Sequence, residues 1–349
     1  MSILSIIVAI ILFAVVILFH ELGHFLLAKA NGIRVNEFCL GFGPTLIGFT
    51  RGETTYSIKL LPFGGACMME GEDGDSADER AFGNASVWAR ISVVAAGPLF
   101  NFLMAILFSF FIIMNVGYSS PVISDVIEGY AAEAAGLQGG DEIVKVGGYS
   151  IHFYNEISLF ANFHEGETIE VVYQRDGQSY TTSLTPKYDE ESGRYLYGFI
   201  KTDGYTRVGP LKGLWLGVCE VRYWIYTTIQ SLKGMVTGLY GVSDMSGPVG
   251  IVREVGSTYD ESVADSGYWY AFLNMLKWGT LLAANLGVMN LLPIPALDGG
   301  RLVFLIIEAI RRKKIDPDKE GMVHLIGFAL LFALMIFVMG NDILRIFKG

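Results

Sequence analysis

Four long runs without a charged residue divide the chain. They cover residues 2–19, the stretch between Arg90 and Asp125, the stretch between Lys277 and Asp298, and roughly 322–341. A helix rises about 1.5 Å per residue and a bilayer core is about 30 Å thick, so each run is long enough to cross it. The pattern predicts a polytopic α-helical membrane protein with four transmembrane helices.

The first run has a second interpretation, a signal peptide that is later removed. A signal peptide has a basic start and a cleavage site flanked by small residues, and the sequence shows neither here. We therefore expect a retained transmembrane helix.

The segments between the runs have their own patterns. Residues 33–69 include the β-type sequence "TTYSIKLLPFGGACMM" and predict one or two hairpins lying against the membrane. The acidic tract "EGEDGDSADER" (70–80) suggests calcium, but it lacks a twelve-residue loop with a closing glutamate. A solvated loop is the better interpretation.

Residues 118–202 are charged, alternating and rich in turns, which predicts a soluble α+β domain inserted between membrane helices. The segment "AAEAAGLQGGDEIVKVGGYSI" (131–151) resembles the bacterial PDZ signature, a short helix followed by Gly-Leu-x-x-Gly-Asp-x-Ile. A generic small β-domain is the alternative.

Residues 211–240 carry an apolar stripe at helical spacing, interrupted by Glu220, Arg222 and Lys233. An amphipathic helix on the outer membrane surface fits this pattern best. A fifth transmembrane helix is the alternative, but it would place the basic "RRKK" sequence outside the cell.

These patterns divide the chain into eight segments. They are a first transmembrane helix (1–31), a cytoplasmic-side hairpin region with an acidic loop (32–87), a second transmembrane helix (88–117), an extracytoplasmic PDZ domain (118–205), an extracytoplasmic surface helix and loop (206–267), a third transmembrane helix (268–310), a basic cytoplasmic loop (311–321) and a fourth transmembrane helix (322–349).

Composition and charge support this picture. Of 349 residues, 52% are hydrophobic and only 17% are charged, too apolar for an ordinary soluble domain. The net charge of −10 argues against a nucleic-acid partner, which would need a basic face. The loops after the first run and around "IRRKKIDPDK" hold the basic residues, so both are expected in the cytoplasm of a cell-membrane protein. The three cysteines, Cys39, Cys67 and Cys219, are widely spaced and are expected to have a packing role.

The end of the first run contains "HELGH", which is His20-Glu21-Leu22-Gly23-His24. Residues four apart share a face of a helix, so both imidazoles can bind one metal while Glu21 reaches a nearby water. Zinc lowers the pKa of such a water towards about 7. Glu21 can then take its proton and later pass it to the leaving amine. The alternative is that both histidines lie at the membrane interface and extend their rings to water. This alternative does not explain the glutamate between them.

A catalytic zinc needs a third protein ligand. His152 and His164 fall in the predicted soluble domain. His324 is a lone histidine in the last run, and neighbouring groups can provide its hydrogen bonds without a metal. Asp298 is the better candidate, because a carboxylate in such apolar company needs a partner. His20 lies about 27 Å along its predicted helix from Ser2, and Asp298 lies about 30 Å along its predicted helix from Trp278. Both helices are expected to run from outside to inside, so the two residues reach a similar depth near the cytoplasmic face.

With these residues in view, the chain resembles the site-2 proteases, a family of intramembrane zinc metalloproteases, in its bacterial RseP-like branch. The specific motif is N-x-x-P-x-P-x-L-D-G, from Asn290 to Gly299. The segments "LPFGG" (61–65), "AAGPLFN" (95–101) and "SGPVGI" (246–251) also resemble family segments in the expected order. Enterobacterial members carry two PDZ domains in tandem, whereas this chain has room for one.

The resemblance implies one zinc ion per chain, held by His20, His24 and Asp298, with Glu21 as the general base. It also implies that Asn285 and Asn290 position the substrate. The expected substrates are transmembrane segments of single-span proteins in the lipid bilayer, such as an anti-sigma factor already trimmed by a site-1 protease, or leftover signal peptides.

A helical substrate must be held extended before it can be cut. The edge of "LLPFGGAC" (60–67), with Gly64 and Gly65, is expected to pair with a substrate strand. Pro293 and Pro295 are expected to break the third transmembrane helix and form the cleft wall, with Asn290 pointing into the cleft. Alternatively, the prolines only kink the helix and Asn290 caps it.

The predicted function is therefore regulated intramembrane proteolysis by a zinc metalloendopeptidase. A catalytically inactive PDZ scaffold is one alternative, but an inactive relative would be expected to have lost Glu21 or a ligand. A metal transporter is another, but it would present ionisable residues on several helices across the bilayer.

Overall fold

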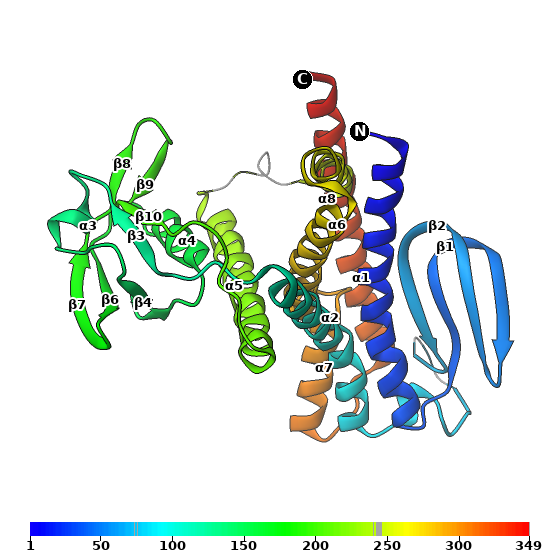
Figure 1. Cartoon of the computed structure of the whole chain (residues 1–349). Helices are drawn as coiled ribbons and strands as arrows, with labels where there is room; N and C mark the ends of the chain where they lie inside the picture. The colour runs from blue at the N-terminus through cyan, green and yellow to red at the C-terminus, as the bar shows by residue number, and fades with distance from the viewer. Residues whose placement is uncertain (73, 75, 240, 242–245, 349) are drawn as a thin grey trace. The chain divides into compact units, whose positions relative to one another are not determined.

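The computed structural model describes residues 1–72, 74, 76–239, 241 and 246–348 (Figure 1). Two residues of the acidic tract and part of the loop predicted before residue 267 therefore lie outside the described residues. The chain forms two compact units, one of Met1–Phe108 with Ser231–Gly349 and one of Ser109–Gln230.

Long apolar helices dominate the first unit. Among the described residues, three helices are long and apolar enough to cross a membrane: α1 (Ile3–Ala30), α2 (Val87–Val116) and the Lys319–Arg345 part of α8 (Pro317–Lys348). A polytopic membrane protein is thus supported, but the predicted count of four spans is not confirmed. The third predicted span is interrupted by Asn274, Lys277 and Asn285, and its helix ends before Asp298.

That segment is built from α6 (Pro248–Leu291) and α7 (Asp298–Arg311). Gly267 has a φ of 82°, a left-handed conformation that divides α6 into two helices. Thr258 accepts a hydrogen bond from the Trp278 indole at 3.2 Å, and Asn274 donates to Ser262 at 2.8 Å. These bonds join residues on both sides of Gly267, so the first helix packs back against the second.

The first part of α6 lies where the sequence predicts a loop. Residues 248–266 are helical instead. The start of this helix is held by α8, because Gly247 and Gly250 donate backbone hydrogen bonds to Asp342 at 3.0 and 2.8 Å. Its apolar face packs against α1, where Val255 and Ala9 are both fully buried.

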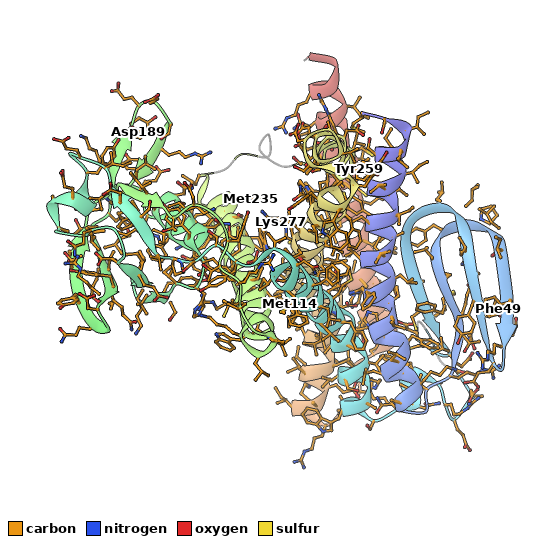
Figure 2. The ribbon with its side chains drawn as sticks, viewed as in Figure 1. Phe49, Met114, Asp189, Met235, Tyr259 and Lys277 are labelled. Carbon is orange, nitrogen blue, oxygen red and sulfur yellow. The ribbon has the colours of Figure 1, made fainter. Side chains whose placement is uncertain are left out.

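A β-hairpin of β1 (Val35–Arg51) and β2 (Thr54–Met69) follows α1, as predicted. Phe38 pairs with both Cys67 and Tyr56, so the first part of β1 lies between the two ends of β2. The large apolar side chains of Ile47 and Phe49 are more than half exposed. Phe49 is labelled in Figure 2. The hairpin also packs against α1.

The second unit contains the predicted α+β domain. Its main antiparallel sheet has the order β5 (Tyr149–Ser150), β4 (Glu142–Val146), β6 (Ile169–Arg175) and β7 (Gln178–Leu184). The short helix α3 (Ala131–Ala134) and the helix α4 (Tyr154–Phe163) pack on a core that includes Ile143 and Val171. Smaller pairs are formed by β3 (Ile123–Val126) with β10 (Phe199–Lys201), and by β8 (Lys187–Asp189) with β9 (Arg194–Leu196).

The Gly-Asp turn of this domain has a structural role. Asp141 is fully buried and accepts two hydrogen bonds from Arg175, at 2.6 and 2.7 Å, and one from the Gln138 backbone at 2.9 Å. A buried carboxylate needs such partners, because an unpaired charge is costly to bury.

The helix α5 (Pro210–Thr237) covers the segment predicted to lie on the membrane surface. It is not one of the three candidate spans among the described residues, so a fifth span is not supported. Arg222, which interrupts its apolar stripe, donates to buried Glu156 of the α+β domain at 2.8 Å. Leu216 and Cys219 pack with Phe153 of the same domain. This part of α5 therefore packs against the α+β domain within the second unit.

Candidate metal centre and active-site cavity

The two histidines of the HELGH motif lie one turn apart on the same face of α1. Both are buried, and their rings meet edge to face with centroids 4.8 Å apart. The Nε2 atoms of His20 and His24 are 3.2 Å from each other. The local helical spacing alone brings these two nitrogen atoms together.

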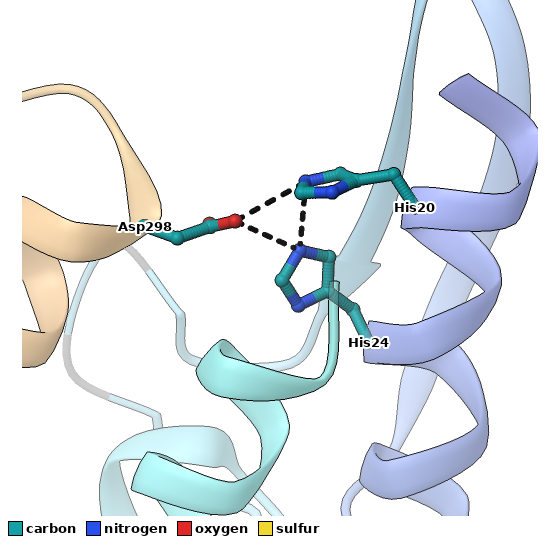
Figure 3. A group of neighbouring side chains, drawn as sticks. All are labelled: His20, His24 and Asp298. Atoms are coloured by element: carbon teal, nitrogen blue, oxygen red, sulfur yellow. Dashed lines mark hydrogen bonds and ion pairs between the residues drawn. The ribbon is translucent and has the colours of Figure 1, made fainter. Parts of the chain in front are cut away.

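Asp298 completes a three-residue cluster from a distant part of the chain (Figure 3). It is the first residue of α7, and its Oδ2 lies 3.1 Å from His20 Nε2 and 3.5 Å from His24 Nε2. Within the described residues, this is the one group of three or more histidine, cysteine or acidic side chains that could hold a metal ion. The structure thus brings together the three residues predicted as ligands.

The three atoms fit a zinc ion. Ligand atoms about 2.0–2.1 Å from a tetrahedral zinc stand about 3.4 Å apart, close to the separations of 3.1, 3.2 and 3.5 Å found here. The Oδ2 atom of Asp298 is also buried without a hydrogen-bond partner. Two imidazoles and a carboxylate are a donor set that zinc prefers.

The histidine rings are held by α2. His24 Nδ1 lies 2.9 Å from the Val93 carbonyl oxygen, which can accept only from a protonated Nδ1. The proton on Nδ1 leaves the lone pair of Nε2 facing Asp298, as metal binding requires.

The amide of Asn101 holds the other ring. Asn101 is fully buried, and its amide lies 3.1 Å from His20 Nδ1. If the amide nitrogen faces His20, the buried Asn101 oxygen has no partner. With the nearly isosteric amide turned around, the oxygen accepts the Nδ1 proton and Nε2 is free for a metal. With its oxygen toward His20, Asn101 would favour the tautomer that a metal site needs.

Close contact between α1 and α2 makes this arrangement possible. A Cβ atom on Gly97 would lie 2.3 Å from His24 Nε2, and one on Gly23 would lie 2.4 Å from the Ala96 carbonyl oxygen. Both distances are far below van der Waals contact. The glycines of "HELGH" and "AAGPLFN" therefore let the imidazoles lie against the α2 backbone.

Two further glycines bring Asp298 to the site. Residues 292–297 are not helical, and the chain becomes helical again at Asp298, where α7 begins. A Cβ on Gly299 would lie 2.2 Å from the Leu292 carbonyl oxygen, and one on Gly300 would lie 2.4 Å from that of Ile294. The break between α6 and α7 thus folds tightly over the first turn of α7.

A cavity of about 670 Å³ opens beside the cluster. His20, Glu21, His24 and Asp298 line it together with Gly64 and Gly65 of the hairpin, Asn290 of α6, and Arg301 and Glu72. Arg301 and Glu72 form an ion pair. Glu21 faces the strand edge, since the Cβ position of Gly65 is 3.1 Å from its Cγ atom.

Three of the predicted substrate-binding residues lie outside the lining of the cavity. Asn285, Pro293 and Pro295 are not among the residues that line the cavity. Asn285 is half-buried within α6, more than one turn before Asn290. The two prolines lie in the break, where Ala296 and Leu297 face the cavity instead. Asn290 does reach the cluster, with its amide 3.3 Å from His20 Nε2.

The remaining candidates have structural surroundings. Cys67 lines the cavity, but it is not one of the three side chains that form the candidate metal cluster, and burial raises the pKa of its thiol. His152 and His164 belong to the second unit. His324 lies on α8, where its Nδ1 accepts a hydrogen bond from the Ala296 backbone at 2.9 Å.

Sequence reasoning missed Asn101, Gly97 and the carbonyl group of Val93. "AAGPLFN" had been noted only as a family-like segment, without a role for its members. The available signal was a polar residue and two helix-breaking residue types inside an apolar run, which marks a close helix contact or a buried hydrogen bond.

An apolar helix with HExxH, a carboxylate placed where a third metal ligand would lie, and an adjacent cavity are the features of a membrane-embedded metallopeptidase. The family model "Peptidase family M50" matches residues 8–334, and the chain belongs to this family. The predictions of a zinc metalloprotease of the site-2 type, and of intramembrane proteolysis as its activity, are thereby confirmed.

Curated relatives match along nearly the whole chain. A Clostridium acetobutylicum protein whose name describes a zinc metalloprotease is 40% identical over 343 residues, covering 98% of both chains. "Zinc metalloprotease RasP" of Geobacillus kaustophilus is 33% identical, also covering 98% of both. "Regulator of sigma-W protease RasP" of Bacillus subtilis is 31% identical, covering 98% of this chain and 99% of that protein.

Solved structures of PDZ domains match about a quarter of this chain. The PDZ domain of an SdrC-like protein from Listeria monocytogenes is 18% identical, with a TM-score of 0.23, and the match covers 25% of this chain and 93% of that one. The corresponding domain from Listeria innocua is 20% identical, with a TM-score of 0.22.

Proposed function

We propose that the protein cleaves transmembrane segments at one zinc ion per chain, held by His20, His24 and Asp298, with Glu21 as the general base. The observation that carries the proposal is the meeting of three ligand atoms at tetrahedral separations, beside a cavity that Glu21 also lines. The zinc metalloprotease names of the relatives support the choice of metal.

Each residue has a chemical task in this proposal. Zinc, when bound, supplies a Lewis acid that polarises the scissile carbonyl and makes water more acidic. Glu21 takes a proton from the attacking water and delivers it to the leaving amine. Val93 and Asn101 keep the imidazole protons on Nδ1, away from the metal side. The buried position of the cluster keeps bulk water away from the reacting groups.

Substrate binding is proposed at the strand edge and at Asn290. An extended substrate segment would add to the β2 edge at Gly64 and Gly65, which gives its backbone groups partners in an apolar environment. Asn290 lies across the cavity, where its amide can bond to the unwound backbone. Asn285 would act indirectly, because it does not line the cavity.

The proposed location is the cell membrane, with the active site near the cytoplasmic face and the 118–205 domain outside. The basic residues around 311–319 support this orientation. The glycine turns and strand order of that domain support a PDZ-like fold. We propose single-span proteins trimmed by a site-1 protease as substrates, and the name of the Bacillus subtilis relative favours a regulator of a sigma factor.

Metal analysis tests the centre of this proposal. The purified full-length protein should contain close to one zinc per chain, and His20→Ala and Asp298→Ala should each lose most of it. His152→Ala, a histidine of the soluble unit, is the matched control and should keep its zinc. Full zinc retention in Asp298→Ala would exclude this aspartate as the third ligand.

A further inference from the structure

The break at residues 292–297 connects α6 to the Asp298 ligand, so its shape decides where that carboxylate lies. It includes an unfavourable conformation, because Ala296 has a φ of 78° without being glycine. Such a conformation persists only when surrounding contacts hold it. The question is which contacts do so.

The backbone N–H groups of the break can all be accounted for. The two prolines have none. Three residues donate to carbonyl oxygens of the break itself or of the end of α6, namely Leu292, Ile294 and Leu297. The N–H of Ala296 instead donates to Nδ1 of His324 on α8, at 2.9 Å. The strained residue is thus the one held by another helix.

A second contact on the same face of α8 supports this bond. A Cβ on Gly327 would lie 2.4 Å from Pro295 Cβ and 2.5 Å from the Pro295 carbonyl oxygen, so only glycine lets α8 approach this closely. His324 and Gly327 are three residues apart and therefore share a helix face. Together they hold Pro295 and Ala296 against α8.

The chemistry of His324 also suits this task. An imidazole accepts through Nδ1 only when its proton is on Nε2. The Glu320 carboxylate lies 3.9 Å from His324 Nε2 and favours a proton there. The neighbouring helix turn thus supports the tautomer that accepts from Ala296.

We infer that His324 is a positioning residue for the metal site: by holding Ala296, it keeps the break in the shape that presents Asp298 to His20 and His24. This inference rests on the proposed role of Asp298 as a ligand. His324 is not proposed to touch the metal or the substrate. It acts through the backbone of Ala296 and Leu297, which leads directly to Asp298.

Three substitutions separate this role from simple packing. Asparagine places an amide oxygen at the same number of bonds from Cα as Nδ1, whereas glutamine places it one bond further away. Leucine removes the acceptor. The full-length protein of each variant is compared with Leu325→Ala, an exposed neighbour on α8, as the matched control.

Zinc affinity is measured by competition with a chelator, and ligand geometry by the absorption spectrum of the cobalt-substituted protein. His324→Leu and His324→Gln should lose at least tenfold in zinc affinity and change the cobalt spectrum, while His324→Asn stays near wild type. With peptide substrate, kcat should fall more than KM rises. Equal loss in the asparagine and glutamine variants, or wild-type affinity in all three, would overturn the inference.

Asp298→Ala is measured in the same series. If it loses zinc while every His324 variant keeps it, the positioning role fails and the proposed metal site stands. If Asp298→Ala itself keeps its zinc, the proposed site fails. A leucine variant that does not fold still leaves the comparison between asparagine and glutamine to decide.

Discussion

Glu21 has no ligand role in the cluster, although it stands between the two histidines in the sequence. It lines the same cavity as both histidines and faces the hairpin edge at Gly65. A carboxylate in this position can reach a water without competing for the metal, which suits a general base. Its chemistry can therefore be separated from metal binding by one substitution.

Glu21→Gln should keep the fold and the zinc but lower kcat by at least 100-fold, because the amide cannot take the proton. Cleavage is measured with a single-span substrate in reconstituted membranes, with Glu190→Gln at an exposed turn as the control. Single-span proteins already trimmed outside should accumulate on the variant in cells. Substantial turnover by the variant would remove Glu21 as the base.

At the scale of elements, the start of α6 depends on a residue that is 95 positions from Gly247 and 92 from Gly250. Asp342 is buried on α8 and accepts from the backbone of Gly247 and Gly250. A carboxylate here satisfies two N–H groups that a helix start leaves without partners and also faces the positive end of the helix dipole.

Asp342→Ala should therefore lower the free energy of unfolding by about 1–3 kcal/mol, since two buried N–H groups lose their acceptor. Asp342→Asn, which keeps one acceptor oxygen, should lose less. Thermal unfolding in detergent measures both, with the exposed Asp265→Ala of α6 as the control. An unchanged midpoint in the alanine variant would show that the contact contributes nothing.

The same two elements show what the sequence can and cannot predict. The helix that carries His20 and His24 was predictable because apolar length and four-residue spacing are local patterns. Asp298 was found because a carboxylate in an apolar stretch needs a partner. The first half of α6 was missed because its start is capped by Asp342 from another helix. Arg222 looks like an interruption of the apolar stripe of α5 in the sequence, because its partner Glu156 lies 66 positions away and is found only in the folded domain.

At the scale of the whole molecule, the first unit must convert a stable helix into a cleavable strand. Backbone groups exposed by unwinding a helix need new partners, because unsatisfied ones are costly in a bilayer. Gly64 and Gly65 of the hairpin line one wall of the cavity, where the proposed strand pairing would provide such partners. Asn290 provides a side-chain amide on another wall, 3.3 Å from His20 Nε2.

If Asn290 holds the unwound substrate, its removal should matter most when unwinding is difficult. Asn290→Ala should then lower kcat/KM at least tenfold for a substrate with a stable helix. The loss should be much smaller for a matched substrate with glycine or proline near the cut site, which unwinds at little cost. Asn274→Ala, another asparagine of α6 that bonds to Ser262, is the control for a general effect on this helix. If Asn290 only supports the end of α6, both substrates should lose the same factor, and equal losses would exclude a role in holding the unwound chain.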